Sequence, residues 1–318
     1  MPIKLVFKGK RVLITGGAGF IGSHLAELLA PGNDVTILDD GSTGKLENIK
    51  KFENRVEFVE GSILDVLLLK KVLKDIEIVF HLAALPSVER SVKDPKSTHE
   101  VNTTGTLNML TIARDYKISK FIYASSSSVY GDTPELPKNE KMGLNPLSPY
   151  AVSKAVGELY CKVFTKVYRL PTVVLRYFNV FGPRQNPKSQ YAAVIPKFID
   201  LMSQNQKPLI YGDGKQTRDF TFVDNVLWGT ELAAVAKDVE GEVFNIACGN
   251  QISVNALVDT LNNIMAKDIK PIYTDPRSGD IKHSRADILK ATRLLGYEEV
   301  VSFEEGVKRT VENMVNSG

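Results

Sequence analysis

The chain has 318 residues, of which 43% are hydrophobic and 24% are charged, the composition of a soluble globular protein with a large core. Its 40 basic and 37 acidic side chains give a net charge of +3, which argues against nucleic acid or an anionic membrane as the main partner. Cys161 and Cys248 are the only cysteines and the amino terminus lacks a signal-like apolar segment, so a cytoplasmic protein without a disulfide framework is expected.

The first predicted element is a strand that runs through a tight turn into a helix. The stretch KRVLITGGAGFIG at 10–22 has an apolar run followed by glycines at 16, 19 and 22, and helical apolar spacing continues to residue 30. In a dinucleotide site, Gly16 turns the chain off the strand, Gly19 leaves room for a pyrophosphate and Gly22 lets the helix approach the strand. The free N–H groups at the start of the helix would then face the phosphates.

A second apolar strand over 34–38 leads to Asp39, about 20 residues after the glycine turn, where an acid can bind the adenosine ribose diol. An acid at this position repels a 2′-phosphate, which favours NAD over NADP. A purely structural turn and another nucleotide are the alternatives for the glycine motif.

Strand and helix patterns alternate from there to about residue 180. The pattern predicts an α/β fold with a doubly wound, Rossmann-type parallel sheet covered on both faces. After residue 179 the regularity breaks, and we expect a smaller mixed α/β lobe that binds substrate. The predicted domains are 1–180 for NAD and 181–318 for substrate, with about 215–250 returning to the first. Strands are expected at 56–59, 76–80, 120–124 and 172–176, and helices at 65–74, 102–116, 149–168, 191–202 and 223–237.

Tyr150 and Lys154 lie four residues apart near the start of a predicted helix, so their side chains share one face. A phenol acts as a base only if its pKa falls from about 10 toward neutrality, and a nearby ammonium together with a nicotinium charge would lower it. An ordinary surface pair is the alternative. The strand over 120–124 favours the catalytic interpretation, because it ends in four serines, 125–128, where an open α/β sheet binds its ligand.

The ordered motifs of the chain resemble the extended short-chain dehydrogenase/reductase family and, within it, the UDP-sugar 4-epimerases. The resemblance covers nearly the whole sequence. The motifs are GGAGFIG at 16–22, LDD at 38–40, HLAAL at 81–85, VNTTGT at 101–106, SSSSVYGD at 125–132, YAVSK at 150–154, RYFNVFGPRQNP at 176–187, YGDGKQTRDF at 211–220 and RSGDIKHSRAD at 277–287.

The resemblance implies roles for individual residues. Ser126, four residues before the tyrosine of the VYG motif, takes the position of the catalytic hydroxyl. Tyr150 takes that of the general base, and Lys154 lowers its pKa and holds the nicotinamide ribose. One departure is Ser62, which stands where many relatives carry an acid beside the adenine. The implied NAD contacts are Gly16, Gly19, Phe20, Ile21, Asp39, Ser42, Thr43, Gly44, Ser62, Ile63, Leu82, Ala83, Ala84, Tyr150 and Lys154.

The family's first step removes the proton of the sugar 4-hydroxyl while a hydride moves from C4 to NAD. In an epimerase the 4-keto sugar then turns and takes the hydride back on its other face. Ser127 and Ser128 stand where 4,6-dehydratases carry an Asp–Glu pair, and Ser128 stands where uronate decarboxylases keep a glutamate, which disfavours both reactions. The implied UDP-sugar contacts are Ser87, Ser126, Asn179, Val194, Tyr211, Arg218, Arg277, Asp280 and Ser284.

Ser284 ends the segment G-D-x-x-x-(Y/S/C), in which a small residue leaves room for a 2-acetamido group. We therefore expect UDP-N-acetylglucosamine to be accepted alongside UDP-glucose, with UDP-uronic acids as an open alternative. An NAD-binding sensor without activity is disfavoured, because such a protein would not need Tyr150 and Lys154. No metal site is predicted. The resemblance also implies a homodimer built through the helices at 102–116 and 149–168.

Overall fold

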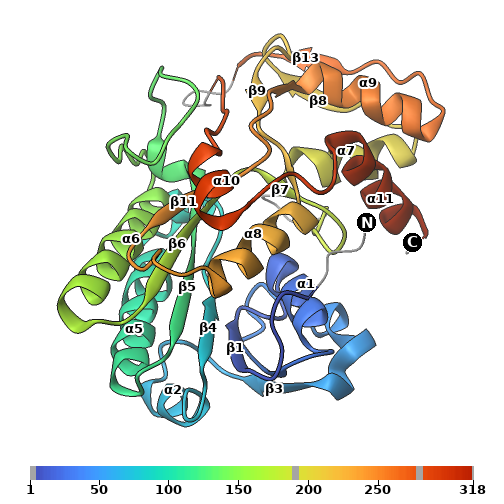
Figure 1. Ribbon diagram of the computed structural model, residues 1–318. Coiled ribbons are helices and arrows are strands. Elements are labelled where there is room, and N and C mark those ends of the chain that lie inside the picture. The colour runs from blue at the N-terminus through green and yellow to red at the C-terminus, as the bar shows by residue number, and fades with distance from the viewer. Residues whose placement is uncertain (1–4, 188–192, 277–281, 317–318) are drawn as a thin grey trace.

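The computed structural model describes residues 5–187, 193–276 and 282–316. Its centre is a sheet of seven strands in the order β11-β6-β5-β4-β1-β2-β3, and every neighbouring pair is parallel (Figure 1). This confirms the predicted fold class. The strands are β1 (Arg11–Thr15), β2 (Asp34–Asp39), β3 (Val56–Glu60), β4 (Ile78–His81), β5 (Lys120–Ser126), β6 (Thr172–Tyr177) and β11 (Val243–Ile246).

Helices cover both faces of this sheet because its strands are apolar on both sides. In β1, Val12 and Ile14 pack into one hydrophobic cluster and Leu13 packs into another, on the opposite face. One face carries α2 (Val66–Val72), α5 (Thr106–Asp115) and α6 (Pro149–Tyr168), and the other carries α1 (Phe20–Leu29), α8 (Val223–Val235) and α10 (Leu289–Leu295).

A smaller lobe lies beyond the carboxyl ends of the strands, at the upper right of Figure 1. Its helices α7 (Val194–Ser203), α9 (Val254–Met265) and α11 (Phe303–Asn316) pack on one another. Three two-stranded sheets complete it: β7 (Val180–Phe181) with β10 (Thr221–Phe222), β9 (Thr217–Arg218) with β12 (Ile252–Ser253), and β8 (Leu209–Tyr211) with β13 (Ile272–Thr274).

Two elements of the stretch 215–250, α8 and β11, lie on the seven-stranded sheet, whereas β9 lies in the smaller lobe. The division of the chain into two domains stays a prediction. Within the described ranges, no helix combines the length and the apolar character that a membrane span requires.

The helix expected at 102–116 differs in detail from the observed structure. The chain is already helical in α4 (Pro95–His99), passes through a π-helical turn over Glu100–Gly105 and continues as α5 from Thr106. Gly105 packs closely against Ile63, since a Cβ on Gly105 would lie 2.5 Å from the Ile63 side chain. The wider turn sits beside the site described next, as is common for π-bulges. A further short helix, α3 (Val88–Lys93), was not expected.

Candidate active site

The glycine turn between β1 and α1 opens into a pocket at the carboxyl edge of the sheet, which we call the sheet-edge pocket. Gly16 has φ +72°, and a Cβ there would lie 2.8 Å from the backbone nitrogen of Ala83. A Cβ on Gly22 would lie 2.2 Å from the Gly16 carbonyl oxygen, so this glycine is needed by the turn itself. Gly19 caps α1 without a side-chain hydrogen bond, which leaves the first-turn N–H groups open to an anionic ligand.

Asp39 ends β2 beside this turn. Its carboxylate accepts hydrogen bonds from the backbone N–H groups of Ala18, at 3.0 Å, and Gly41, at 2.9 Å, and burial raises its pKa. A carboxylate has about four lone-pair sites, so two remain for a ribose diol. Gly44 closes the loop over the acid, since a Cβ there would lie 2.7 Å from Asp39 Oδ1.

Most of the predicted cofactor residues line this one pocket. They are Gly16, Gly19, Phe20, Ile21, Asp39, Ser42, Thr43, Ile63, Leu82, Ala83, Ala84, Tyr150 and Lys154.

Two predicted cofactor residues, Gly44 and Ser62, are not among its lining residues. The Ser62 hydroxyl accepts the Leu64 N–H at 3.3 Å, and Asp65 in the same segment caps α2. The polar groups of Ser62 and Asp65 are therefore used in local hydrogen bonds, at the position where the chain departs from the family pattern.

Nine lining residues were not among the predicted NAD contacts. Three of them, Asp40, Gly61 and Tyr177, end a strand or directly follow one, which is the signal that would have found them. The nine are Gly22, Leu38, Asp40, Gly61, Pro86, Val101, Ala124, Ser125 and Tyr177.

The three predicted catalytic side chains come together at the carboxyl end of β5. Ser126 is the last residue of β5, and its hydroxyl forms a hydrogen bond with that of Tyr150. Tyr150 stands in the first turn of α6, which Ser148 caps by accepting the Ala151 N–H at 3.1 Å. Burial raises the pKa of Tyr150, and the bond with Ser126 lowers it.

Lys154 reaches the same place from one turn further along α6. Its amine donates to the carbonyl oxygen of Ala124 at 2.8 Å and lies 6.0 Å from the centre of the Tyr150 ring. Burial lowers the pKa of Lys154 to about 8. The amine is the cation placed to stabilise a phenolate at Tyr150.

His81, at the end of β4, forms hydrogen bonds that connect β4 to β1 and α5 beside this pocket. Its ring nitrogens bond the hydroxyls of Thr15, at 2.7 Å, and Thr106, at 2.9 Å. The Thr15 hydroxyl in turn accepts the Ala83 N–H at 3.2 Å. Burial lowers the pKa of His81 to about 3, so the ring stays neutral and serves as a hydrogen-bonding strut.

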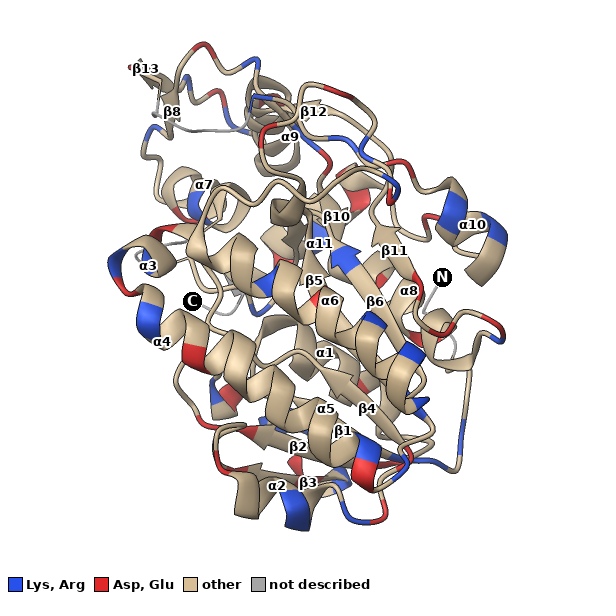
Figure 2. Cartoon of the chain, turned by 90° about the vertical axis from the view of Figure 1, so that its left-hand side faces the viewer, with Lys and Arg blue, Asp and Glu red and all other residues tan. Residues whose placement is uncertain are grey.

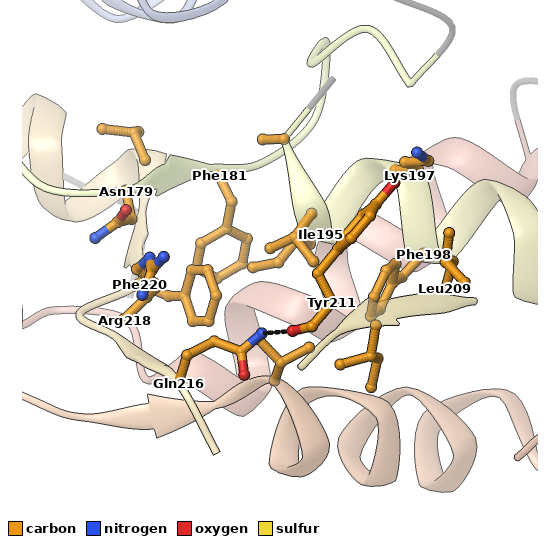
Figure 3. Close-up of a pocket in the computed structure, with 15 residues that line it drawn as sticks. Asn179, Phe181, Ile195, Lys197, Phe198, Leu209, Tyr211, Gln216, Arg218 and Phe220 are labelled. Carbon is orange, nitrogen blue, oxygen red and sulfur yellow. Dashed lines mark hydrogen bonds between the residues drawn. The ribbon is translucent and has the colours of Figure 1, made fainter. Parts of the chain in front are cut away.

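A second hollow, the lobe pocket, lies between β7, α7 and β8 (Figure 3). Its lining is largely apolar and includes Phe181, Phe198 and Phe220. Polar side chains, among them Asn179 and Arg218, complete the lining. Gln216 donates to the Tyr211 carbonyl oxygen at 2.8 Å. Four of the predicted substrate residues line this pocket: Asn179, Val194, Tyr211 and Arg218.

Asn179 and Arg218 are already oriented by backbone carbonyl groups. The Asn179 amide donates to the Asp219 carbonyl oxygen at 3.2 Å, and its backbone has φ +36°. The Arg218 guanidinium donates to the Thr217 carbonyl oxygen at 3.0 Å. Because Asn179 follows Tyr177 by two residues, the chain itself links the lobe pocket to the sheet-edge pocket.

The other predicted substrate residues lie elsewhere. Ser284 is held beside β9 by its N–H bond to the Thr217 carbonyl oxygen at 3.1 Å, and it is not a lining residue of either pocket. Ser87 caps α3 with φ +95° and also lines neither pocket. Arg277 and Asp280 lie outside the described residues.

The family described as GDP-mannose 4,6 dehydratase matches residues 13–310 of the chain. A putative UDP-glucose 4-epimerase of Methanocaldococcus jannaschii is 42% identical over 309 residues, which cover 96% of this chain and 99% of that protein.

Two solved structures share the whole fold. The UDP-N-acetylglucosamine 4-epimerase of Methanobrevibacter ruminantium M1, in complex with UDP-N-acetylmuramic acid, is 41% identical with a TM-score of 0.95, covering 98% of this chain and 100% of that one. The UDP-glucuronic acid 4-epimerase of Bacillus cereus, in complex with UDP-glucuronic acid and NAD, is 36% identical with a TM-score of 0.90, covering 97% and 100%.

Proposed function

Because the chain belongs to the extended short-chain dehydrogenase/reductase family, we propose that it is an NAD-dependent 4-epimerase of UDP-sugars. The enzyme inverts C4 of the sugar through a transient 4-keto form. The observation that carries the proposal is that Tyr150 and Lys154 line the pocket that also holds the glycine turn and Asp39, with Ser126 beside Tyr150 at the end of β5.

The sheet-edge pocket fits NAD. The open first-turn N–H groups of α1 suit the pyrophosphate, and the Asp39 carboxylate suits the adenosine ribose. Lys154 lies where it can hold the nicotinamide ribose. When bound, NAD supplies an acceptor and donor for one hydride at C4 of the sugar.

The protein's own part in the reaction is to move one proton. Tyr150 takes the proton of the 4-hydroxyl, and Ser126, whose hydroxyl lies beside that of Tyr150, shares this proton with the sugar oxygen and the phenol. The Lys154 ammonium stabilises the phenolate. After the sugar has presented its other face, Tyr150 returns the proton, so the protonation state of the enzyme is unchanged over a full cycle.

The residues after Ser126 favour this outcome over elimination. A dehydratase must also move a C5 proton and expel the C6 hydroxyl. Ser127 and Ser128 begin a short 3₁₀-helix at this point and offer hydroxyl groups in place of an acid and a base. The 4-keto sugar therefore has no proton carrier here for loss of its C6 group.

The lobe pocket suits the nucleotide. Its apolar lining accommodates a planar base near Tyr211, and Arg218 and Asn179 are donors for diphosphate oxygens. Firm binding of the nucleotide leaves the sugar free to turn, as epimerisation requires.

Among the sugars, we assign UDP-glucose and UDP-N-acetylglucosamine as substrates. The small Ser284 beside Arg218 supports room for the acetamido group, and so does the similarity to the M. ruminantium enzyme. The similarity to the B. cereus enzyme supports UDP-glucuronic acid as the second candidate.

Proton NMR of the purified protein with each of the three UDP-sugars, with and without added NAD, tests the proposal. We expect new anomeric signals of the galacto isomers, and their relative rates rank the substrates. A stable 4-keto product would replace epimerisation by dehydration. No turnover of any of the three sugars would contradict the proposed activity.

We also propose that the protein is a homodimer. The side chains of Val152, Leu159, Val163 and Val167 are about half exposed and form a stripe along α6, and Figure 2 shows a long uncharged stretch on the neighbouring α5. An apolar stripe of this kind gains free energy when a second copy covers it.

A further inference from the structure

A buried ion pair lies directly behind the catalytic residues. Glu158 on α6 and Arg176 on β6 each keep only 4% of their side-chain surface exposed. Arg176 Nε lies 2.9 Å from Glu158 Oε1, and Nη2 lies 2.6 Å from Oε2, so the contact is bidentate. Nothing in the proposed reaction uses either charge.

Such a pair is costly to fold. Desolvation offsets most of its Coulomb energy, and apolar residues of similar volume often replace a buried pair without loss of stability. Arg176 Nη1 adds to the cost, because it is buried without a hydrogen-bond partner among the described residues. A role in the active site would account for keeping the pair.

Glu158 contacts one residue of the active site and lies one helical turn from another. Its Oε1 accepts the Ser125 hydroxyl at 2.5 Å, and Ser125 both lines the sheet-edge pocket and precedes Ser126. Glu158 also follows Lys154 by four residues on α6, so the two side chains lie on one face of the helix.

The surroundings of the Lys154 amine make this carboxylate important. Tyr123 on β5 lies with its ring centre 5.2 Å from the amine, and Tyr150 and Cys161 face it from α6. Burial raises the pKa of all three, so they are neutral near pH 8. His81 on β4 is also neutral there. Among these described neighbours, Glu158 supplies the negative charge.

We propose that Glu158 is a positioning residue of this active site, whose buried carboxylate keeps the Lys154 amine charged and fixes Ser125 at the end of β5. Arg176 orients the carboxylate through its two hydrogen bonds. The catalytic consequence rests on the proposed function, whereas the coupling between Glu158 and Lys154 is a property of the folded chain alone.

The coupling is measured by urea unfolding from pH 6 to pH 10.5. The four proteins are wild type, Lys154→Met, the pair variant Glu158→Gln/Arg176→Gln, and the triple variant. The pair variant avoids leaving a buried charge alone. The difference between each protein and its Lys154→Met partner isolates the titration of Lys154.

The sign follows from linkage. Burial places the folded pKa of Lys154 near 8, below its value of about 10.4 in an unfolded chain, so its contribution to stability rises with pH between the two values. Without Glu158 the folded pKa falls further, and we expect this rise to begin at least about one pH unit lower in the pair variant. An unchanged onset would overturn the proposal.

Arg176→Gln is the matched control, because it breaks the same ion pair but leaves the carboxylate. A merely structural pair predicts the same shift for both changes, whereas our proposal predicts no downward shift for Arg176→Gln. This comparison also decides the matter if the pair variant does not fold, since a downward shift in Arg176→Gln would contradict the role of Glu158.

In the active enzyme, the alkaline limb of the kcat–pH profile is expected to move down by the same amount in the pair variant, with KM for the UDP-sugar within twofold. A shifted unfolding profile without any epimerase activity in the wild type would refute the proposed function and leave the coupling standing. An unshifted profile in an active enzyme would refute the coupling alone.

Discussion

Tyr150 acts as a base only as a charged phenolate, and its buried environment disfavours that charged form. Burial raises the pKa of its hydroxyl, and the bond with Ser126 lowers it. Moving a phenol from its ordinary pKa to near neutrality takes about 4 kcal/mol of preferential stabilisation of the phenolate. The Lys154 amine, 6.0 Å from the ring centre, is the group of this chain placed to contribute to it.

Replacing Tyr150 by Phe is expected to reduce turnover by at least about 100-fold, because the proton of the 4-hydroxyl then has no acceptor. Binding of NAD should persist, since the glycine turn and Asp39 are untouched. Proton NMR gives the rate, and chromatography of the released nucleotide gives the NAD content. Tyr116→Phe, at an exposed tyrosine on the same face of the sheet, is the control and should keep full activity. Substantial turnover in Tyr150→Phe would assign the base elsewhere.

At the scale of elements, the close contact between α6 and β5 sets the geometry of the catalytic residues. Gly157 makes this contact possible, because a Cβ there would lie 2.1 Å from the Tyr123 hydroxyl oxygen. The same approach lets the Lys154 amine reach the Ala124 carbonyl oxygen.

We therefore expect Gly157→Ala to lower the free energy of unfolding by about 1–3 kcal/mol through overpacking, measured by urea denaturation. Tyr123→Leu in the same chain should restore part of the loss. Gly143→Ala is the matched control, since no atom lies within 4 Å of its Cβ position, and it should change stability by less than about 0.5 kcal/mol. Equal effects at the two glycines would show that α6 tolerates displacement.

The exposed stripe on α6 leads to a second prediction at this scale. Val163→Glu places a charge in the middle of the stripe and should convert the proposed dimer into a monomer, as measured by light scattering after size-exclusion chromatography. Leu289→Glu on α10, where the side chain is 72% exposed, is the control and should leave the mass unchanged. A dimeric Val163→Glu protein would place the interface on another surface.

At the scale of the whole molecule, the two pockets belong to different parts of one chain. The sheet-edge pocket is built from loops that follow the parallel strands, and the lobe pocket from β7, α7 and β8. Two ligands that bind only the folded state should each add to its stability.

NAD at 100 times its Kd is expected to stabilise the protein by about 2.7 kcal/mol, and saturating UDP should add a separate increment. Arg218→Ala should keep the rise in Tm with NAD and lose most of the rise with UDP, because Arg218 lines the lobe pocket and not the sheet-edge pocket. Differential scanning fluorimetry with each ligand separately and with both measures the shifts. Loss of the NAD shift in this variant would contradict the separation of the pockets.

Because apolar periodicity and glycine turns are local signals, the sequence alone was enough to predict six of the seven strands of the sheet, but not β11 or the helix α3. It therefore predicted α6 with its observed bounds, Pro149–Tyr168, and a parallel sheet covered on both faces. The family resemblance implied most lining residues of the sheet-edge pocket, many of which lie in or after the loops where β1, β2 and β4 end.

Which distant residues meet follows from the folded structure and could not be read from the sequence. The polar groups of Ser62 and Asp65 are used in local hydrogen bonds, and Gly105 at the end of the π-helical turn packs against Ile63. The contact of Glu158 with Arg176 joins α6 to β6, and no spacing along the chain reveals it. Packing between elements is set by side chains far apart in sequence, whereas the elements themselves follow from neighbours within a few residues.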